Sequence, residues 1–115
     1  MTLREKQSIF ARNVANLIEW CFLNGHEVTL GEAHRPEWVA LEYAKQGKGS
    51  VNSLHIIRLA IDLMLFKDGE YLTQTEDYKR VGDAWKVLNS QNRWGGDFAS
   101  RADGNHFSCE HEGKQ

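Results

Sequence analysis

Apolar side chains recur at steps of three and four along the first stretch of the chain, which is the spacing of one helix face. Between residues 4 and 23 these positions are Ile9, Phe10, Val14, Leu17, Ile18, Cys21 and Phe22. Asn24-Gly25 follows them and is a typical helix stop. The pattern therefore predicts an amphipathic helix over residues 4–23 that packs on a core.

The next segments have shorter patterns. Residues 27–30 alternate and are rich in strand-forming residues, so we expect a short strand there. Pro36 suits the first turn of a helix, and the residues after it predict a second helix over 37–44. The glycines and serine of residues 47–50 predict a flexible loop.

The middle of the chain predicts a hairpin. Residues 59–66 form a short apolar run, which indicates a buried strand. Lys67-Asp68-Gly69 is a turn signal, and Tyr71-Leu72 would be the return arm.

A third helix and a last strand are expected near the end of the sequence. The apolar face of this helix would consist of Tyr78, Val81, Trp85 and Leu88. Thr73, which has capping-box spacing to a glutamate, or Thr75 would be its N-cap. Residues 94–98 lead into a loop, and residues 106–109 resemble a short strand.

This order of elements predicts an α+β protein, with a small, mostly antiparallel sheet packed against about three helices. A length of 115 residues fits one domain over residues 1–115, and no composition shift suggests a boundary. The formal net charge of −2 gives no reason to expect nucleic acid or an anionic membrane as partner. No apolar run approaches the roughly 20 residues of a membrane span. We expect a monomer with no stable membrane association.

The chain starts without the features of an export signal. Residues 1–7 run directly into the amphipathic pattern, with no apolar core and no small-residue cleavage site. We therefore expect synthesis in the cytoplasm, where thiols stay reduced. Cys21 and Cys109 are accordingly predicted to be free.

Three scattered residues have the chemistry of one catalytic zinc site. They are His55, Asp62 and His106. Two imidazoles and a carboxylate suit this ion, and three protein ligands leave the fourth position for water. A seven-residue spacing places His55 and Asp62 on one face of a helix, but the strand-like sequence around Asp62 instead puts His55 on the loop that enters this strand.

Asp62 stands between Ile61 and Leu63, where a carboxylate is costly to bury unless it is paired or bound to a metal. The residues alone leave two readings open. Asp62 is either a metal ligand or a carboxylate bonded to Arg58 or to backbone amides.

Asp103 and His106 flank a turn sequence, Gly104-Asn105, which brings their side chains near each other. Asp103 is therefore a candidate base for a metal-activated water. Alternation after the turn puts Cys109 on the face opposite to His106, so we expect Cys109 in the core and not as a ligand. The other histidines, for which an ordinary hydrogen-bonded role is expected, are His26, His34 and His111.

Ser53-x-His55 and Asp62, followed by Asp103-x-x-His106, resemble the M15 zinc peptidases. These are D-alanyl-D-alanine carboxypeptidases and dipeptidases, and small phage endolysins that cut L-alanyl-D-glutamate bonds in peptidoglycan. Their pattern reads S-x-H-x-x-G-x-A-x-D, followed by an acidic residue shortly before a second histidine. The positions matched in the first part are Ser53, His55, Ala60 and Asp62.

Two further segments extend the resemblance from about Thr29 to Phe107. Residues 32–35 are similar to a family segment that delivers an arginine toward the substrate, and residues 94–98 are similar to the segment before the acidic residue in phage members. Arg58 departs from the pattern, because the family has glycine there. Glycine at such a position usually reflects close backbone approach or special dihedral angles.

The resemblance implies a fold of the Hedgehog/DD-peptidase type with a zinc site at the sheet edge. The implied zinc ligands are His55, Asp62 and His106. Asp103 would be the general base, and Arg35 would face the developing oxyanion or a substrate carboxylate. Ser53 would form a hydrogen bond with substrate or with a zinc ligand.

The implied substrate is a peptidoglycan stem peptide. Asp103 matches the L-alanyl-D-glutamate endolysin branch, whereas carboxypeptidases usually have glutamate there. An endolysin without an export signal would reach the cell wall through a membrane pore such as a phage holin. The alternatives are a D-alanyl-D-alanine carboxypeptidase or dipeptidase, and a non-catalytic wall-binding or structural module.

Overall fold

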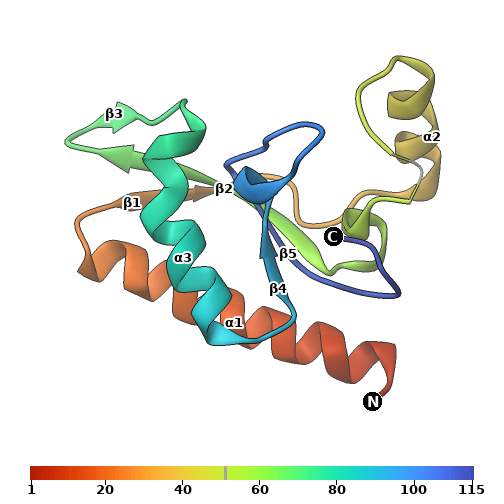
Figure 1. Ribbon diagram of the computed structural model, residues 1–115, viewed down its shortest axis with the longest axis horizontal. Helices are drawn as coiled ribbons and strands as arrows, with labels where there is room; N and C mark the ends of the chain where they lie inside the picture. The colour runs from red at the N-terminus through yellow and green to blue at the C-terminus, as the bar shows by residue number, and fades with distance from the viewer. Residues whose placement is uncertain (51) are drawn as a thin grey trace.

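The computed structural model describes residues 1–50 and 52–115, which form an α+β fold as predicted (Figure 1). The helices are α1 (Leu3–Leu23), α2 (Glu37–Lys45) and α3 (Lys79–Leu88), with short 3-10 helices η1 (Leu54–Ile57), η2 (Thr75–Tyr78) and η3 (Gly95–Asp97). The strands are β1 (Glu27–Leu30), β2 (Ala60–Lys67), β3 (Glu70–Tyr71), β4 (Asn92–Trp94) and β5 (His106–Cys109). Within the described residues, no helix has the length and apolarity needed to span a membrane.

The sheet is antiparallel throughout and is organised around β2. The strand order is β1-β2-β5-β4, and β3 forms the predicted hairpin with the end of β2. Residues 63–66 of β2 pair with β1, whereas residues 60–62 pair with β5. Asp62 lies at this change of partner, directly opposite His106.

One hydrophobic core lies between the sheet, α1 and α3. Alternate residues of β2 enter it, as the period of two along a strand requires: Ile61, Leu63 and Leu65. The predicted stripe of α1 contributes Phe10, Val14, Leu17 and Cys21, while Ile9 and Phe22 at its margins stay exposed. Helix α2 projects away from this core (Figure 1). The intervening residue Asp62 therefore belongs to the other face of the sheet, away from the helices.

Both cysteines are buried free thiols, as predicted. Burial raises the pKa of the Cys21 thiol to about 11. Cys109 is part of the core cluster, so it lies on the face of β5 that was expected from the alternation.

The sequence did not predict three local features. His55 lies on η1 and not on a loop, and β4 pairs with β5 although its three residues are too few to show a pattern. Neither Thr73 nor Thr75 caps the third helical segment. Gln74 is instead the N-cap residue of η2, and its N–H donates to Asp77 Oδ2 at 3.2 Å across the same three-residue spacing, one position further along.

Arg58 ends η1 in the left-handed conformation, with φ 59° and ψ 37°. Its N–H reaches back to the carbonyl groups of Leu54 and His55, and its side chain is exposed. This conformation costs a residue with a Cβ about 1–2 kcal/mol, whereas glycine adopts it freely. Arg58 thus has a conformation that suits glycine, the residue of the M15 pattern at this position.

Replacing Arg58 by glycine should therefore stabilise the protein. We expect Arg58→Gly to raise the free energy of unfolding by about 1 kcal/mol and Arg58→Val to lower it, measured by urea denaturation. Arg12→Gly, at an exposed position inside α1, is the control and should lower the same quantity by about 1 kcal/mol. A loss of stability in Arg58→Gly would contradict the strain assigned to this residue.

Candidate metal centre

The pairing of β2 with β5 brings Asp62 and His106 together although they are far apart in sequence. They are direct antiparallel partners, so their side chains leave the same face of the sheet, with Cβ atoms about 4.5–5.5 Å apart in such pairs. His106 Nδ1 lies 3.8 Å from Asp62 Oδ1. The sheet register alone therefore brings together two of the three residues of the candidate site.

The 3-10 helix η1 supplies the third residue. Ser53 caps this helix, because its Oγ accepts a hydrogen bond of 3.2 Å from the His55 N–H. The carbonyl oxygen of His55 accepts a bond of 3.0 Å from the Arg35 N–H, which ties η1 to the segment after β1. The imidazole of His55 is buried, and its Nε2 lies 3.3 Å from Asp62 Oδ1.

The three side chains fit a divalent metal ion. One ligand atom from each lies within 4.8 Å of those of the other two. Ligand bonds of about 2.0–2.2 Å in a tetrahedral zinc site place neighbouring ligand atoms about 3.3–3.6 Å apart. The distances from Asp62 Oδ1 to His55 Nε2 and His106 Nδ1, 3.3 and 3.8 Å, are close to this range. Asp62 Oδ1 is buried without a hydrogen-bond partner among the described residues. A bound cation would satisfy this oxygen, which is otherwise costly to bury.

The electrostatics of the cluster favour an ionised Asp62. Burial by itself would raise the pKa of this carboxyl, but the neighbouring His106 and His55 imidazoles outweigh burial and lower the pKa to about 2. The carboxylate is therefore present at neutral pH, as a metal ligand must be.

Glu32 is a residue of the site whose role the sequence did not reveal. Its Oε1 lies 3.6 Å from His55 Nδ1 and accepts a hydrogen bond of 2.8 Å from Arg35 Nε. The separation of 3.6 Å is longer than a hydrogen bond, and His55 Nδ1 has no hydrogen-bond partner among the described residues, so the carboxylate contributes a nearby negative charge on the Nδ1 side while Nε2 lies toward Asp62. The three-residue spacing from Glu32 to Arg35 was the only sequence signal for this pairing.

All six residues selected from the sequence line one cleft of about 440 Å³: Arg35, Ser53, His55, Asp62, Asp103 and His106. The guanidinium of Arg35 is ion-paired with Glu32 and lies 5.0 Å above the ring centre of Tyr43. Ser53 uses its hydroxyl oxygen to cap η1. Asp103 is exposed on the wall of the cleft.

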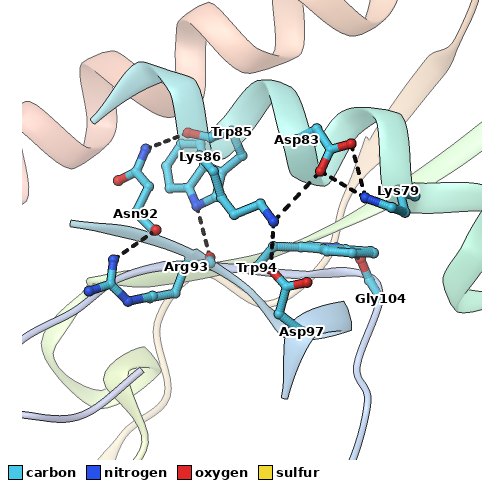
Figure 2. A network of polar contacts seen from close by, with 9 residues as sticks. All are labelled: Lys79, Asp83, Trp85, Lys86, Asn92, Arg93, Trp94, Asp97 and Gly104. Atoms are coloured by element: carbon cyan, nitrogen blue, oxygen red, sulfur yellow. Dashed lines mark hydrogen bonds and ion pairs between the residues drawn. The ribbon is translucent and has the colours of Figure 1, made fainter. Parts of the chain in front are cut away.

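Trp94 and Gly95 fix the turn that carries Asp103. The indole Nε1 of Trp94 donates a 2.7 Å hydrogen bond to the carbonyl oxygen of Gly104, and Lys86 lies over the indole beside Asp97 (Figure 2). The Asp103 N–H donates to the carbonyl oxygen of Gly95 at 2.9 Å. A Cβ on Gly95 would clash with the carbonyl oxygen of Asp103, so only glycine permits this approach.

The competing roles considered for these residues do not match the geometry. Asp62 contacts the two histidines, and its backbone N–H bonds to the carbonyl oxygen of Glu32. Arg58 is exposed and forms no ion pair with Asp62. His111 Nδ1 lies 3.3 Å from Lys6 Nζ, which agrees with the ordinary hydrogen-bonded role expected for this histidine.

Comparison with known proteins agrees with this fold. An M15 peptidase family profile described as D-alanyl-D-alanine carboxypeptidase matches residues 46–109, more than half of the chain. The chain belongs to the M15 peptidase family. Among solved structures, the Serratia marcescens L-Ala D-Glu endopeptidase ChiX superposes with a TM-score of 0.75 at 18% identity, over 88% of this chain and 77% of that chain. Curated protein sequences give no match.

The role of Gly95 can be tested by adding a single methyl group. Gly95→Ala forces the Asp103 carbonyl to move, and we expect the free energy of unfolding to fall by about 1–3 kcal/mol in urea denaturation. Ala99→Ser, at an exposed position of the same loop, should change it by less than about 0.5 kcal/mol. A Gly95→Ala protein as stable as the wild type would show that the close approach is unimportant.

Proposed function

We propose that this chain is a zinc-dependent peptidase that hydrolyses stem peptides of bacterial peptidoglycan, as an L-alanyl-D-glutamate endopeptidase of the phage or prophage endolysin type. The observation that carries the proposal is the His55–Asp62–His106 cluster, which shares one cleft with Asp103 in a chain of the M15 family. The fold likeness to an L-Ala D-Glu endopeptidase and the aspartate at position 103 support the choice of bond.

The cluster would hold Zn²⁺ through His55 Nε2, Asp62 Oδ1 and His106 Nδ1, the atoms that face one another. The chemistry supplied by a zinc ion held there is Lewis acidity, which acidifies a water molecule and polarises a carbonyl group. Three protein ligands suit this role better than a structural one, since structural zinc sites use four. The Glu32 carboxylate, 3.6 Å from His55 Nδ1, would favour a proton on Nδ1 and so leave Nε2 free to bind the metal.

Asp103 would move the proton. Asp103 lines the same cleft, and its carboxylate would take the proton of the attacking water and then return it to the leaving amine. The hydrogen bonds from Trp94 to Gly104 and from Asp103 to Gly95 hold the backbone of this turn. A carboxylate on an ordered turn can transfer a proton without the entropic cost of ordering its loop first.

Arg35 would stabilise the oxyanion that develops on the substrate carbonyl. Its ion pair with Glu32 and its place over Tyr43 fix the guanidinium beside the cluster. A preorganised cation acts mainly on the transition state, where the charge appears. Ser53 would act through the His55 backbone that it caps.

A D-alanyl-D-alanine carboxypeptidase or dipeptidase is the second candidate. The family profile that matches residues 46–109 bears the carboxypeptidase description, which favours this activity. Both candidates use the same residues for proton transfer and metal binding. They differ in the bond that is placed in the cleft.

The division of roles predicts different losses in two variants. Asp103→Ala should keep bound zinc but lose at least about 100-fold in peptidoglycan hydrolysis, whereas His106→Ala should lose both. Zinc content is measured by elemental analysis after dialysis, and hydrolysis by the release of soluble peptides. Glu19→Gln, at an exposed position on α1, is the control and should match the wild type in both. Wild-type hydrolysis by Asp103→Ala would exclude this residue as the base.

A further inference from the structure

The cleft has three cationic side chains, and one of them is already neutralised inside the protein. Arg35, Lys48 and Arg101 line the cleft. Arg35 donates from Nε to Glu32 and forms an ion pair with it through Nη2, and its side chain is only 12% exposed. Arg35 is therefore ion-paired before any substrate binds, and the proposed mechanism already assigns it to the oxyanion.

Lys48 and Arg101 are different, because their charges have no internal partner. Within residues 1–50 and 52–115, neither side chain forms an ion pair or a hydrogen bond, and both residues are exposed. The Lys48 N–H bonds at 2.7 Å to the carbonyl oxygen of Tyr43, which fixes its backbone to the end of α2. Arg101 lies two residues before Asp103 on the loop that leads to β5.

The two residues reach the cleft from different segments. Lys48 belongs to the loop that follows the projecting helix α2, whereas Arg101 belongs to the loop between η3 and β5 (Figure 1). Ser50, two residues after Lys48, and Ser100, directly before Arg101, also line the cleft and offer neutral hydroxyl donors. An anionic group between these segments would meet two cations and two hydroxyl groups.

The charge in the cleft contrasts with that of the whole chain, which has a formal net charge of −2. The acidic side chains that line the cleft, Asp62 and Asp103, already have proposed roles as metal ligand and base. Two unpaired cations in a concave site attract anions of the substrate, and charge-assisted hydrogen bonds to a carboxylate are stronger than neutral ones. The two unpaired positive charges of the cleft therefore suit a peptide that has a free carboxylate near the bond to be cut.

We propose that Lys48 and Arg101 bind a substrate carboxylate on the residue whose amine leaves, and that they select free-acid stem peptides over amidated ones. This inference rests on the proposed function. Arg101 is assigned to the leaving side because it lies two residues before Asp103, on the same loop, and Asp103 would return the proton to the leaving amine. A D-glutamate that continues through its side-chain carboxyl has such a free carboxylate at its α position.

The test compares two synthetic stem peptides that differ only in this group, one with the free carboxylate and one with a carboxamide. The zinc-loaded wild type should cut the acid with a kcat/KM about tenfold higher, as expected for a partly exposed charge-assisted contact. Raising the ionic strength from about 0.01 to 1 M should reduce this ratio, since it shortens the Debye length from about 30 to 3 Å. A merely structural role of the two cations would give no such salt dependence.

Variants identify the residues responsible. Lys48→Gln and Arg101→Gln should each lower the acid-to-amide ratio, and together they should bring it to within about twofold of unity. Lys48→Arg should restore most of the preference. Lys45→Gln is the matched control, because its side chain is 73% exposed on α2 and lies outside the cleft, and it should keep the wild-type ratio.

Binding separates this inference from the proposed function. Zinc-loaded Asp103→Ala is titrated with both peptides by calorimetry, alone and combined with the two glutamine substitutions. Cleavage of both peptides at equal kcat/KM would overturn the inference and leave the proposed function intact. Absence of cleavage, with tighter binding of the acid that Lys48→Gln and Arg101→Gln abolish, would overturn the proposed function and support the inference. Equal binding of both peptides without cleavage would overturn both.

Discussion

The pairing register of β2 with β5 is the constraint on which the candidate site depends. Asp62 stands opposite His106 and on the face of β2 away from the core, while its neighbours Ile61 and Leu63 enter the core. A slip of one residue would turn Asp62 into the core and a leucine or isoleucine into the cleft. The burial of apolar side chains under α1 and α3 therefore fixes the register, and the register brings Asp62 and His106 together.

The remaining parts of the site are attached to this strand pair by hydrogen bonds. Trp94 holds the turn before β5 through Gly104, and Ser53 and Arg35 hold the backbone of η1 that carries His55. These are hydrogen bonds between a side chain and the backbone or between two backbone segments. They hold the backbone of the irregular segments that carry His55 and Asp103 against the sheet.

The parts of the structure that could be predicted from the sequence are those that have a strong periodicity or a residue that is costly to bury. The stripe of α1, the strand β2 and the unusual position of Asp62 each show a repeat or a penalty that is visible in single letters. The contact of Glu32 with His55 could not be predicted, because it depends on how the end of β1 approaches η1 in space. Likewise β4 has three residues and exists only because β5 pairs with it. The internal pairing of Arg35 with Glu32 was missed for the same reason, and because of this pairing we propose Lys48 and Arg101 for the contact with a substrate carboxylate.

The central claim concerns the bond that is cut, and identification of the ends released from purified peptidoglycan tests it most directly. Zinc-loaded protein is incubated with the polymer, and the products are sequenced by mass spectrometry. The account predicts new L-alanine carboxyl ends and new D-glutamate amino ends, both lost when the metal is chelated. Free D-alanine without these ends would show a carboxypeptidase, and the absence of any product would contradict the assignment as a peptidase of the cell wall.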